Sequence, residues 1–114
     1  MNTELRTPVL DLSGQTQAWL VFKTDFADYL NLADGYVDIS TNGGSTWVNL
    51  LHYDQASYPG PCTETINLTP YVGSVNTIIR FRFVASGWGQ TGYMPLSVPP
   101  WWEVDEVTLT NQNP

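Results

Sequence analysis

Short runs of apolar and β-branched residues, separated by turn-forming residues, follow one another along the chain. Apolar residues rarely recur at the three- and four-residue spacing of a helix, and glycine, proline and asparagine interrupt them often. Such runs are typical of β-strands in antiparallel sheets. We therefore expect strands near residues 7–12, 18–25, 35–40, 47–53, 64–68, 77–84 and 102–110.

The segment 77–84 alternates most clearly. Phe81 and Phe83 share one set of alternate positions, and Arg80 and Arg82 share the other. Successive side chains of a strand point to opposite faces of its sheet. The pattern predicts a strand that buries its aromatic side chains and turns its arginines toward solvent.

Two turn signals help to place the strands. Asn42-Gly43 separates two predicted strands, and Asn-Gly favours a tight hairpin because both residues accept a positive φ. The segment 68–73 contains Pro70 and Gly73 and predicts a compact turn or a single helical turn.

Many short strands with frequent turns predict an all-β fold, an antiparallel β-sandwich of jelly-roll type. The 114 residues suit one hydrophobic core, so we assign residues 1–114 to a single sandwich domain. The polar residues 110–114 resemble the start of a linker or tail. No apolar stretch reaches the roughly 20 residues that span a bilayer, and the first residues lack the features of a signal peptide.

The charge balance is acidic and narrows the classes of partner. The chain has 4 lysine and arginine residues against 11 aspartate and glutamate residues, with a formal net charge of −7. Phosphate binding needs clustered basic residues, so we expect neither nucleic acid nor an anionic membrane as a partner. The single cysteine, Cys62, cannot form an internal disulfide, and we expect a free thiol without a catalytic role.

Five segments occur in the order found in a known family of domains. They read LRTPVLDL from residue 5, AWLVF from residue 18, DGYVDISTNGGSTW from residue 34, INLTPYVGSVNTIIRFRF from residue 66 and WWEVDEVTL from residue 101. This order resembles the MAM-like jelly-roll domains of bacterial secreted proteins. Those domains are attached to immune-inhibitor-A-type metallopeptidases and to surface proteins of the choice-of-anchor type. The resemblance covers nearly the whole chain.

The resemblance implies a non-catalytic domain and, as in many members, a structural cation. The last strand of the family carries a tryptophan, an apolar residue and two acids before a valine. The matching residues here are Trp102, Val104, Asp105, Glu106 and Val107, with glutamate in place of the second aspartate. Two departures are Leu30, where the family often has an acid, and the longer segment 86–101.

The last predicted strand poses a question about Asp105. Counting back by two from Leu109 and Val107 places Asp105 on their face, so it points inward if they do. A buried carboxylate needs a cation, an arginine or several backbone donors. Since oxygen ligands suit Ca²⁺, we predict a structural calcium site formed by Asp105 with one or more of Asp25, Asp28 and Asp34. The alternative is that these three are solvated loop residues, and that Asp105 binds backbone amides or lies at a bulge.

Two pairs of residues are candidates for catalysis. Glu103 and Asp105 share a strand face and resemble part of the E-x-D-x-E strand of jelly-roll glycoside hydrolases, but Val107 replaces the third acid. His52 and Asp54 are two residues apart, and an aspartate can orient a histidine base. No nucleophile motif accompanies this pair, and one histidine is too few for a typical zinc site. We therefore expect no enzymatic activity.

The aromatic residues fall into two groups. One group occupies core-like strand positions and comprises Trp19, Phe22, Trp47, Phe81, Phe83 and Trp102. The other belongs to the glycine- and proline-rich segment 86–101 and comprises Trp88, Tyr93 and Trp101. Loop aromatic residues can bind sugar rings or a protein partner, or they can fold back over the sandwich. We predict that the second group binds the ligand.

These observations predict a non-catalytic accessory module of a secreted or cell-surface multidomain protein. The module binds glycan or supports a neighbouring catalytic domain, with Ca²⁺ as a structural ion. The alternative is a surface adhesion or assembly domain that binds protein, and a jelly-roll glycoside hydrolase comes third.

Overall fold

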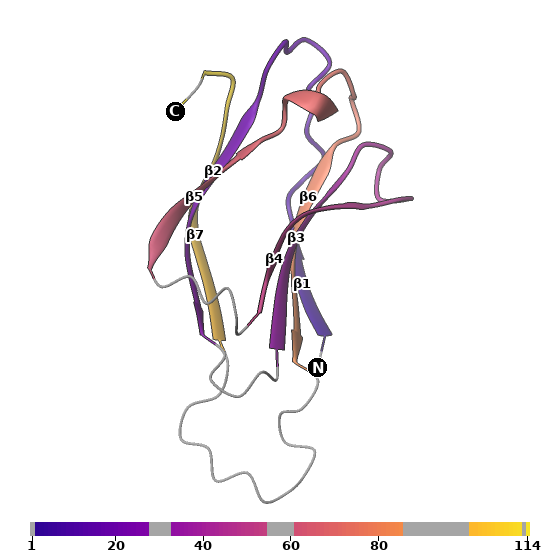
Figure 1. Cartoon of the computed structure of the whole chain (residues 1–114). Coiled ribbons are helices and arrows are strands. Elements are labelled where there is room, and N and C mark those ends of the chain that lie inside the picture. Colours follow the sequence, from indigo (N-terminus) through magenta and orange to yellow (C-terminus); the bar gives the residue numbers. More distant parts are fainter. Residues whose placement is uncertain (1, 28–32, 55–60, 86–100, 113) are drawn as a thin grey trace, which may run out of the picture.

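The computed structural model describes residues 2–27, 33–54, 61–85, 101–112 and 114. These residues form two antiparallel sheets that face each other (Figure 1). The elements in chain order are β1 (Asn2–Arg6), β2 (Trp19–Ala27), β3 (Ala33–Ser40), β4 (Val48–Tyr53), β5 (Cys62–Asn67), the 3-10 helix η1 (Thr69–Tyr71), β6 (Ile78–Ala85) and β7 (Trp101–Thr110).

The four-stranded sheet has the strand order β1-β6-β3-β4, and the three-stranded sheet has the order β5-β2-β7. All neighbouring strands are antiparallel. The predicted all-β antiparallel sandwich is confirmed, whereas the jelly-roll connectivity stays a prediction. Within the described ranges, no helix is long and apolar enough to cross a membrane.

Most of the expected strands lie within a few residues of their predicted positions. The expectation of a strand at residues 7–12 is wrong, because β1 ends at Arg6. Pro8 has no backbone N–H and cannot continue a ladder of hydrogen bonds. Beyond it, the chain returns to the sheet at an isolated bridge between Leu10 and Thr77.

The predicted hairpin joins β3 and β4, but residues 41–47 form a longer loop than the tight turn that Asn-Gly favours. Gly43 and Gly44 have φ values of 72° and 98°, which glycine adopts without steric cost. Asn42 closes the loop, since its Oδ1 accepts a hydrogen bond from the Thr46 backbone N–H at 2.9 Å. The compact turn expected at 68–73 is also confirmed, because η1 occupies it.

Aromatic rings from both sheets meet in the core. Phe22 of β2 packs edge to face against Phe81 of β6, with ring centroids 5.3 Å apart. Phe26 and Trp102 of the three-stranded sheet lie 5.6 Å and 5.7 Å from the ring of Tyr53 in the four-stranded sheet. Such pairs contribute about 0.5–1.5 kcal/mol each beyond the burial of area. The predicted inward face of β6 is therefore confirmed.

Gly35 of β3 allows these rings to approach the four-stranded sheet. A Cβ atom at this position would lie 3.1 Å from the Trp102 ring and 3.2 Å from the Phe26 ring. The absence of a side chain here is therefore part of the core packing.

Trp19 and Trp47 lie on outer faces, so the prediction of core positions for these two residues is wrong. Trp19 alternates with Ala18 and Leu20, which are both buried, and therefore points away from the core. Trp47 precedes β4 and lies against arginine side chains of the outer face, as described below. Both rings are half-buried.

β7 contains a β-bulge at Glu106, where the backbone has a positive φ of 51°. Val21 of β2 pairs with Thr108, but Lys23 pairs with Asp105, so β7 has one additional residue across this step. Two residues of β7 that are an even number of positions apart therefore point to opposite faces of the sheet when the bulge lies between them.

Candidate functional site

The outer face of the four-stranded sheet carries two rows of mostly polar side chains. Strand pairing places the members of each row side by side across the sheet. The first row is Glu4, Arg82, Tyr36 and His52, and the second is Arg6, Arg80, Asp38 and Asn49. We call these residues, together with Trp47, the polar face. The predicted outward direction of the two β6 arginines is confirmed.

Three planar side chains stack in the first row. The rings of Tyr36 and His52 are parallel, with an interplanar angle of 1° and centroids 4.5 Å apart. The Arg82 guanidinium lies 4.2 Å from the centroid of the Tyr36 ring. Because β3 lies between β6 and β4, Arg82 and His52 contact Tyr36 from opposite sides. Stacking restricts the rotation of all three groups and holds their hydrogen-bonding atoms in place.

Asp38 organises the second row. Its carboxylate accepts hydrogen bonds from Arg80 Nε at 2.8 Å, from Asn49 Nδ2 at 2.9 Å and from Arg82 Nε at 3.3 Å. Burial pushes the pKa of Asp38 upward, but the hydrogen bonds from Asn49 and the two arginines outweigh it, so the pKa falls below its usual range. Asp38 is 2% exposed. It therefore remains ionised and fixes both arginines.

Trp47 lies over the arginines of the second row. The guanidinium carbons of Arg80 and Arg6 lie 4.0 Å and 5.0 Å from its ring centroid. Arg6 also pairs with Glu4, with 2.8 Å between Nε and Oε2. The arginines of the polar face thus have acidic or aromatic partners, and the face presents ordered hydrogen-bonding groups instead of a free positive charge.

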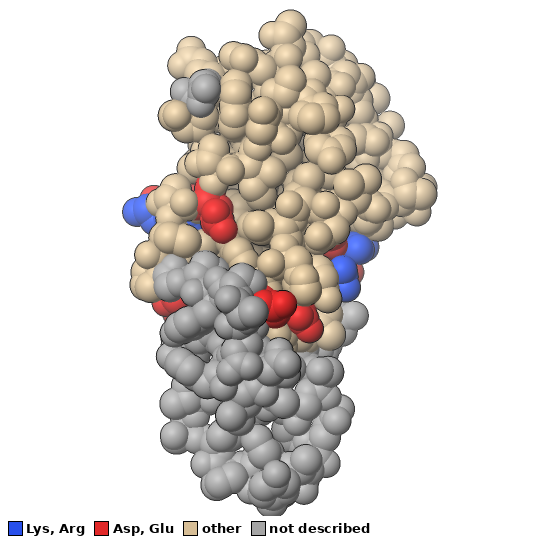
Figure 2. Space-filling model, viewed as in Figure 1, with Lys and Arg blue, Asp and Glu red and all other residues tan. Residues whose placement is uncertain are grey.

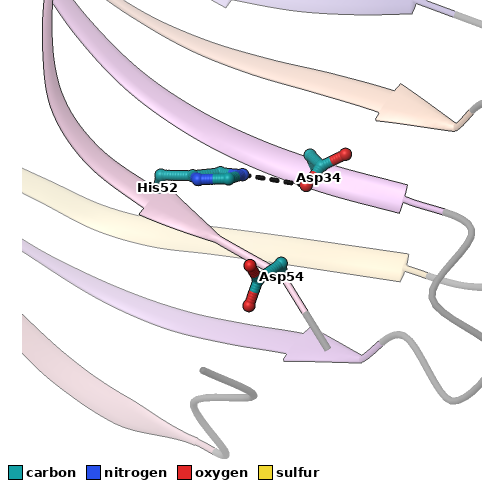
Figure 3. A group of neighbouring side chains, drawn as sticks. All are labelled: Asp34, His52 and Asp54. Atoms are coloured by element: carbon teal, nitrogen blue, oxygen red, sulfur yellow. Dashed lines mark hydrogen bonds and ion pairs between the residues drawn. The ribbon is translucent and has the colours of Figure 1, made fainter. Parts of the chain in front are cut away.

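His52 lies near two carboxylates where β3 begins and β4 ends, and its ring points to one of them, Asp34 (Figure 3). His52 Nε2 lies 2.8 Å from Asp34 Oδ1. Asp54 follows β4, and one potential ligand atom from each of the three residues lies within 4.8 Å of the others. Within the part of the chain that the structure describes, no other three potential metal ligands come this close. We call these three residues the His–Asp cluster.

The prediction that Asp105 points into the core is wrong. The bulge at Glu106 puts Asp105 out of phase with Val107 and Leu109, and Asp105 is exposed. It pairs across the sheet with Lys23, which is also exposed. Its Oδ1 accepts a hydrogen bond from the Glu106 backbone N–H at 2.8 Å. The structure thus shows the alternative arrangement, a carboxylate bound to a backbone amide at a bulge.

The predicted calcium ligands lie on different sides of the sandwich. Asp25 and Asp105 line a depression of about 490 Å³ on the outer face of the three-stranded sheet. Asp34 belongs to the outer face of the other sheet, and Asp28 lies outside the described residues. The calcium site remains a prediction that rests on Asp25 and Asp105.

Several other predicted residues can be placed only in part. Trp88 and Tyr93 lie outside the described residues, as does the side chain of Trp101, whose backbone begins β7. Their predicted role in ligand binding stays a prediction. Cys62 is a free, exposed cysteine at the start of β5. Loss of solvation raises the pKa of its thiol, and the charges of Glu64 and Asp25 raise it further, which disfavours the reactive thiolate.

A groove of about 580 Å³ opens between the sheets where the edge strands β1 and β7 face each other. Leu5 of β1 contributes to it and is 67% exposed. Contiguous exposed apolar surface can mark a protein interface. The other lining residues are Thr3, Glu4, Phe81, Phe83, Trp102 and Val104.

Charged side chains are distributed unevenly in the view of Figure 2. Among the described residues visible there, they gather across the middle of the molecule and are absent from its upper part. The charged side chains seen in this view therefore lie toward the end of the sandwich at which β3 begins and β4 ends (Figure 1).

Sequence reasoning missed the roles of Tyr36 and Asp38. The signal was present, because Asp34, Tyr36 and Asp38 alternate with the apolar or small residues of the same strand. Such alternation indicates a strand with one solvent-facing side. The pairing of that side with the arginines of β6 requires the sheet order, which alternation does not supply.

No protein-family model matches the chain, and no curated protein is significantly similar to it.

Proposed function

We propose that the chain is a non-catalytic accessory module of a secreted or cell-surface protein, and that it binds glycan on the polar face. The observation that carries this proposal is the stack of Arg82, Tyr36 and His52. A guanidinium, a phenol and an imidazole side by side offer both donors and acceptors to the hydroxyl groups of a sugar.

The order already present in the polar face supports this function. The stack and the Asp38 network hold the side chains before any ligand arrives, so binding immobilises few additional rotamers. Trp47 adds an aromatic ring next to the polar groups. Specific ligand sites combine such apolar surface with a few well-placed polar groups.

The resemblance to MAM-like domains supports the accessory role, the location outside the cell or on its surface, and the jelly-roll connectivity. It also supports the structural Ca²⁺ predicted at Asp105 and Asp25. On this proposal, the module attaches its parent protein to a polysaccharide or positions a neighbouring catalytic domain.

Affinity electrophoresis and pull-down with cellulose, xylan, chitin and peptidoglycan test glycan binding. Tyr36→Ala removes the centre of the stack and should weaken binding at least tenfold, which corresponds to about 1.4 kcal/mol. Trp19→Ala is the matched control, because this half-buried aromatic residue lies on the outer face of the other sheet. It should leave binding unchanged.

Trp88→Ala and Trp101→Ala decide between the polar face and the segment 86–101. Loss of binding in these two variants, with full binding in Tyr36→Ala, would contradict the polar face and favour the predicted loop residues. Equal binding by Tyr36→Ala and the wild type would also contradict it.

A surface adhesion or assembly domain is the second candidate, and the apolar groove between β1 and β7 favours it. Leu5 is exposed there beside core aromatic rings. If the wild-type protein retains none of the polysaccharides, this protein-binding function becomes the better proposal.

A further inference from the structure

We propose that Asp34, His52 and Asp54 form a binding site for a divalent transition-metal ion, with Zn²⁺ as the best match. This site is separate from the calcium site predicted at Asp25 and Asp105, and it does not depend on glycan binding. Nothing in the alternation of the sequence joins Asp34 to the other two residues. The pairing of β3 with β4 brings them together.

The geometry is close to that of a metal site. His52 Nε2 and Asp34 Oδ1 are 2.8 Å apart, and a donor atom of Asp54 completes a group within 4.8 Å. Zinc binds nitrogen and carboxylate oxygen at about 2.0–2.2 Å, so its ligand atoms lie about 3.3–3.6 Å from one another in a tetrahedral site. Binding therefore requires the three ligand atoms to adopt this spacing around the ion.

The donor set favours a transition metal over calcium. Calcium takes six to eight oxygen ligands, whereas an imidazole nitrogen suits zinc and its neighbours in the first transition series. In the sequence, one histidine alone is too few for a typical zinc site, but the pairing of β3 with β4 adds two carboxylates to it, and zinc also accepts carboxylate oxygen. Two ionised carboxylates also balance the charge of a divalent ion. Three protein ligands leave at least one coordination position for water or for a group of a bound ligand.

The cluster is held by regular structure. Asp34 lies within β3, where its backbone pairs with Val84 of β6, and His52 lies within β4. Tyr36 stacks on the imidazole at a centroid distance of 4.5 Å and fixes the plane of the ring. Tyr36 therefore acts as a positioning residue for the imidazole.

The single histidine of the chain gives a direct test. Tag-free protein, stripped of metal, is titrated with ZnCl₂, and the NMR signals of the imidazole are followed. Zinc should shift these signals in a saturable manner with one ion bound per chain, whereas the same titration with CaCl₂ should not shift them. Unchanged imidazole signals in the zinc titration would overturn the proposal.

Matched variants locate the ligands. Asp34→Asn and Asp54→Asn, which preserve side-chain size, should each weaken zinc binding at least about tenfold by isothermal titration. Asp105→Asn removes an exposed carboxylate from the opposite sheet and should leave zinc affinity unchanged. Far-UV circular dichroism checks that each variant is folded. Zinc affinity that is the same in the Asp34→Asn, Asp54→Asn double variant as in the wild type would show binding elsewhere and reject the site.

Discussion

At the scale of single residues, Glu106 determines which face of β7 each neighbour occupies. If Glu106 is left out when the positions of β7 are counted, every second residue is apolar. These residues are Trp102, Val104, Val107 and Leu109. Glu106 is thus the inserted residue of the bulge, and its φ of 51° lies in the left-handed region. Residues other than glycine cost roughly 1–2 kcal/mol there, and asparagine tolerates it best.

Glu106→Asn and Glu106→Val should therefore differ in stability. Both variants lose the exposed ion pair with Lys23, which is worth at most about 1 kcal/mol. The valine variant should be about 1–2 kcal/mol less stable than the asparagine variant, because a branched side chain fits a positive φ poorly. Urea unfolding measures the difference.

Thr108 provides the control for this comparison. It is exposed and lies in regular strand beyond the bulge, opposite Val21. At this position valine should be the more stable of the two substitutions, because β-branched residues favour extended backbone. The same order of stability at both positions would contradict the strained backbone at Glu106.

At the scale of elements, a side-chain hydrogen bond joins β4 of one sheet to β5 of the other. Tyr53 of β4 donates from its hydroxyl to Glu64 Oε2 of β5 at 2.5 Å. Burial raises the pKa of the Tyr53 phenol well above its ordinary value, and the hydrogen bond to the Glu64 carboxylate raises it further. The neutral phenol is therefore the form that the folded protein stabilises.

This shift predicts a loss of stability in alkali. A folded-state pKa above the unfolded value, which is about 10, gives stability that is present below pH 10 and is lost as the pH rises further. Tyr53→Phe should cost about 1–3 kcal/mol at neutral pH, because Glu64 loses its partner. The variant should also show a smaller decline in unfolding free energy between about pH 9 and pH 11 than the wild type.

Tyr71→Phe is the matched control for Tyr53→Phe. Tyr71 belongs to η1 and is a partly buried tyrosine that packs against the core. This variant shows what a Tyr→Phe substitution does outside the contact between the sheets. An identical decline in wild type, control and Tyr53→Phe would show that the phenol is not the group responsible.

Strands β6 and β7 show where hydrophobic alternation predicts the orientation of side chains and where it fails. Alternation predicted β6 well because a single period of two runs through it without interruption. It failed in β7 because one inserted residue reverses the phase, and the mismatch between Trp102-Val104 and Val107-Leu109 was the available signal. The His–Asp cluster was predictable only in part. His52 and Asp54 are neighbours in sequence, but Asp34 joins them through a sheet order that no local pattern contains.

At the scale of the whole molecule, the two outer faces carry different chemistry. The polar face combines arginines with aromatic rings. The outer face of the three-stranded sheet instead presents Asp25, Glu103 and Asp105 around the depression described above. The zinc site and the calcium site that we propose therefore lie on opposite outer faces of the sandwich.

Thermal unfolding of chelator-stripped protein tests the calcium prediction. An ion that binds only the folded state adds about 2.7 kcal/mol of stability at a hundredfold excess over its Kd. We expect added CaCl₂ to raise the melting temperature, and Asp105→Asn to remove this rise. The Asp34→Asn variant should keep it, because that residue lies on the other sheet. An unchanged melting temperature on adding calcium to the wild type would reject the site.

The strand order also has a consequence for how the chain reaches its folded state. β1 pairs with β6, and β2 pairs with β7, so both sheets join segments from the two ends of the described chain. Among the paired strands of the described residues, only β3 and β4 follow each other directly in the chain. Chains dominated by such distant contacts fold in milliseconds to seconds. Before β7 pairs with β2, the strand that carries Phe22 and Phe26 has one unpaired edge. An exposed edge of this kind can pair with another chain. Pairing with β7 thus moves the open edge of this sheet away from the strand that carries these two core rings.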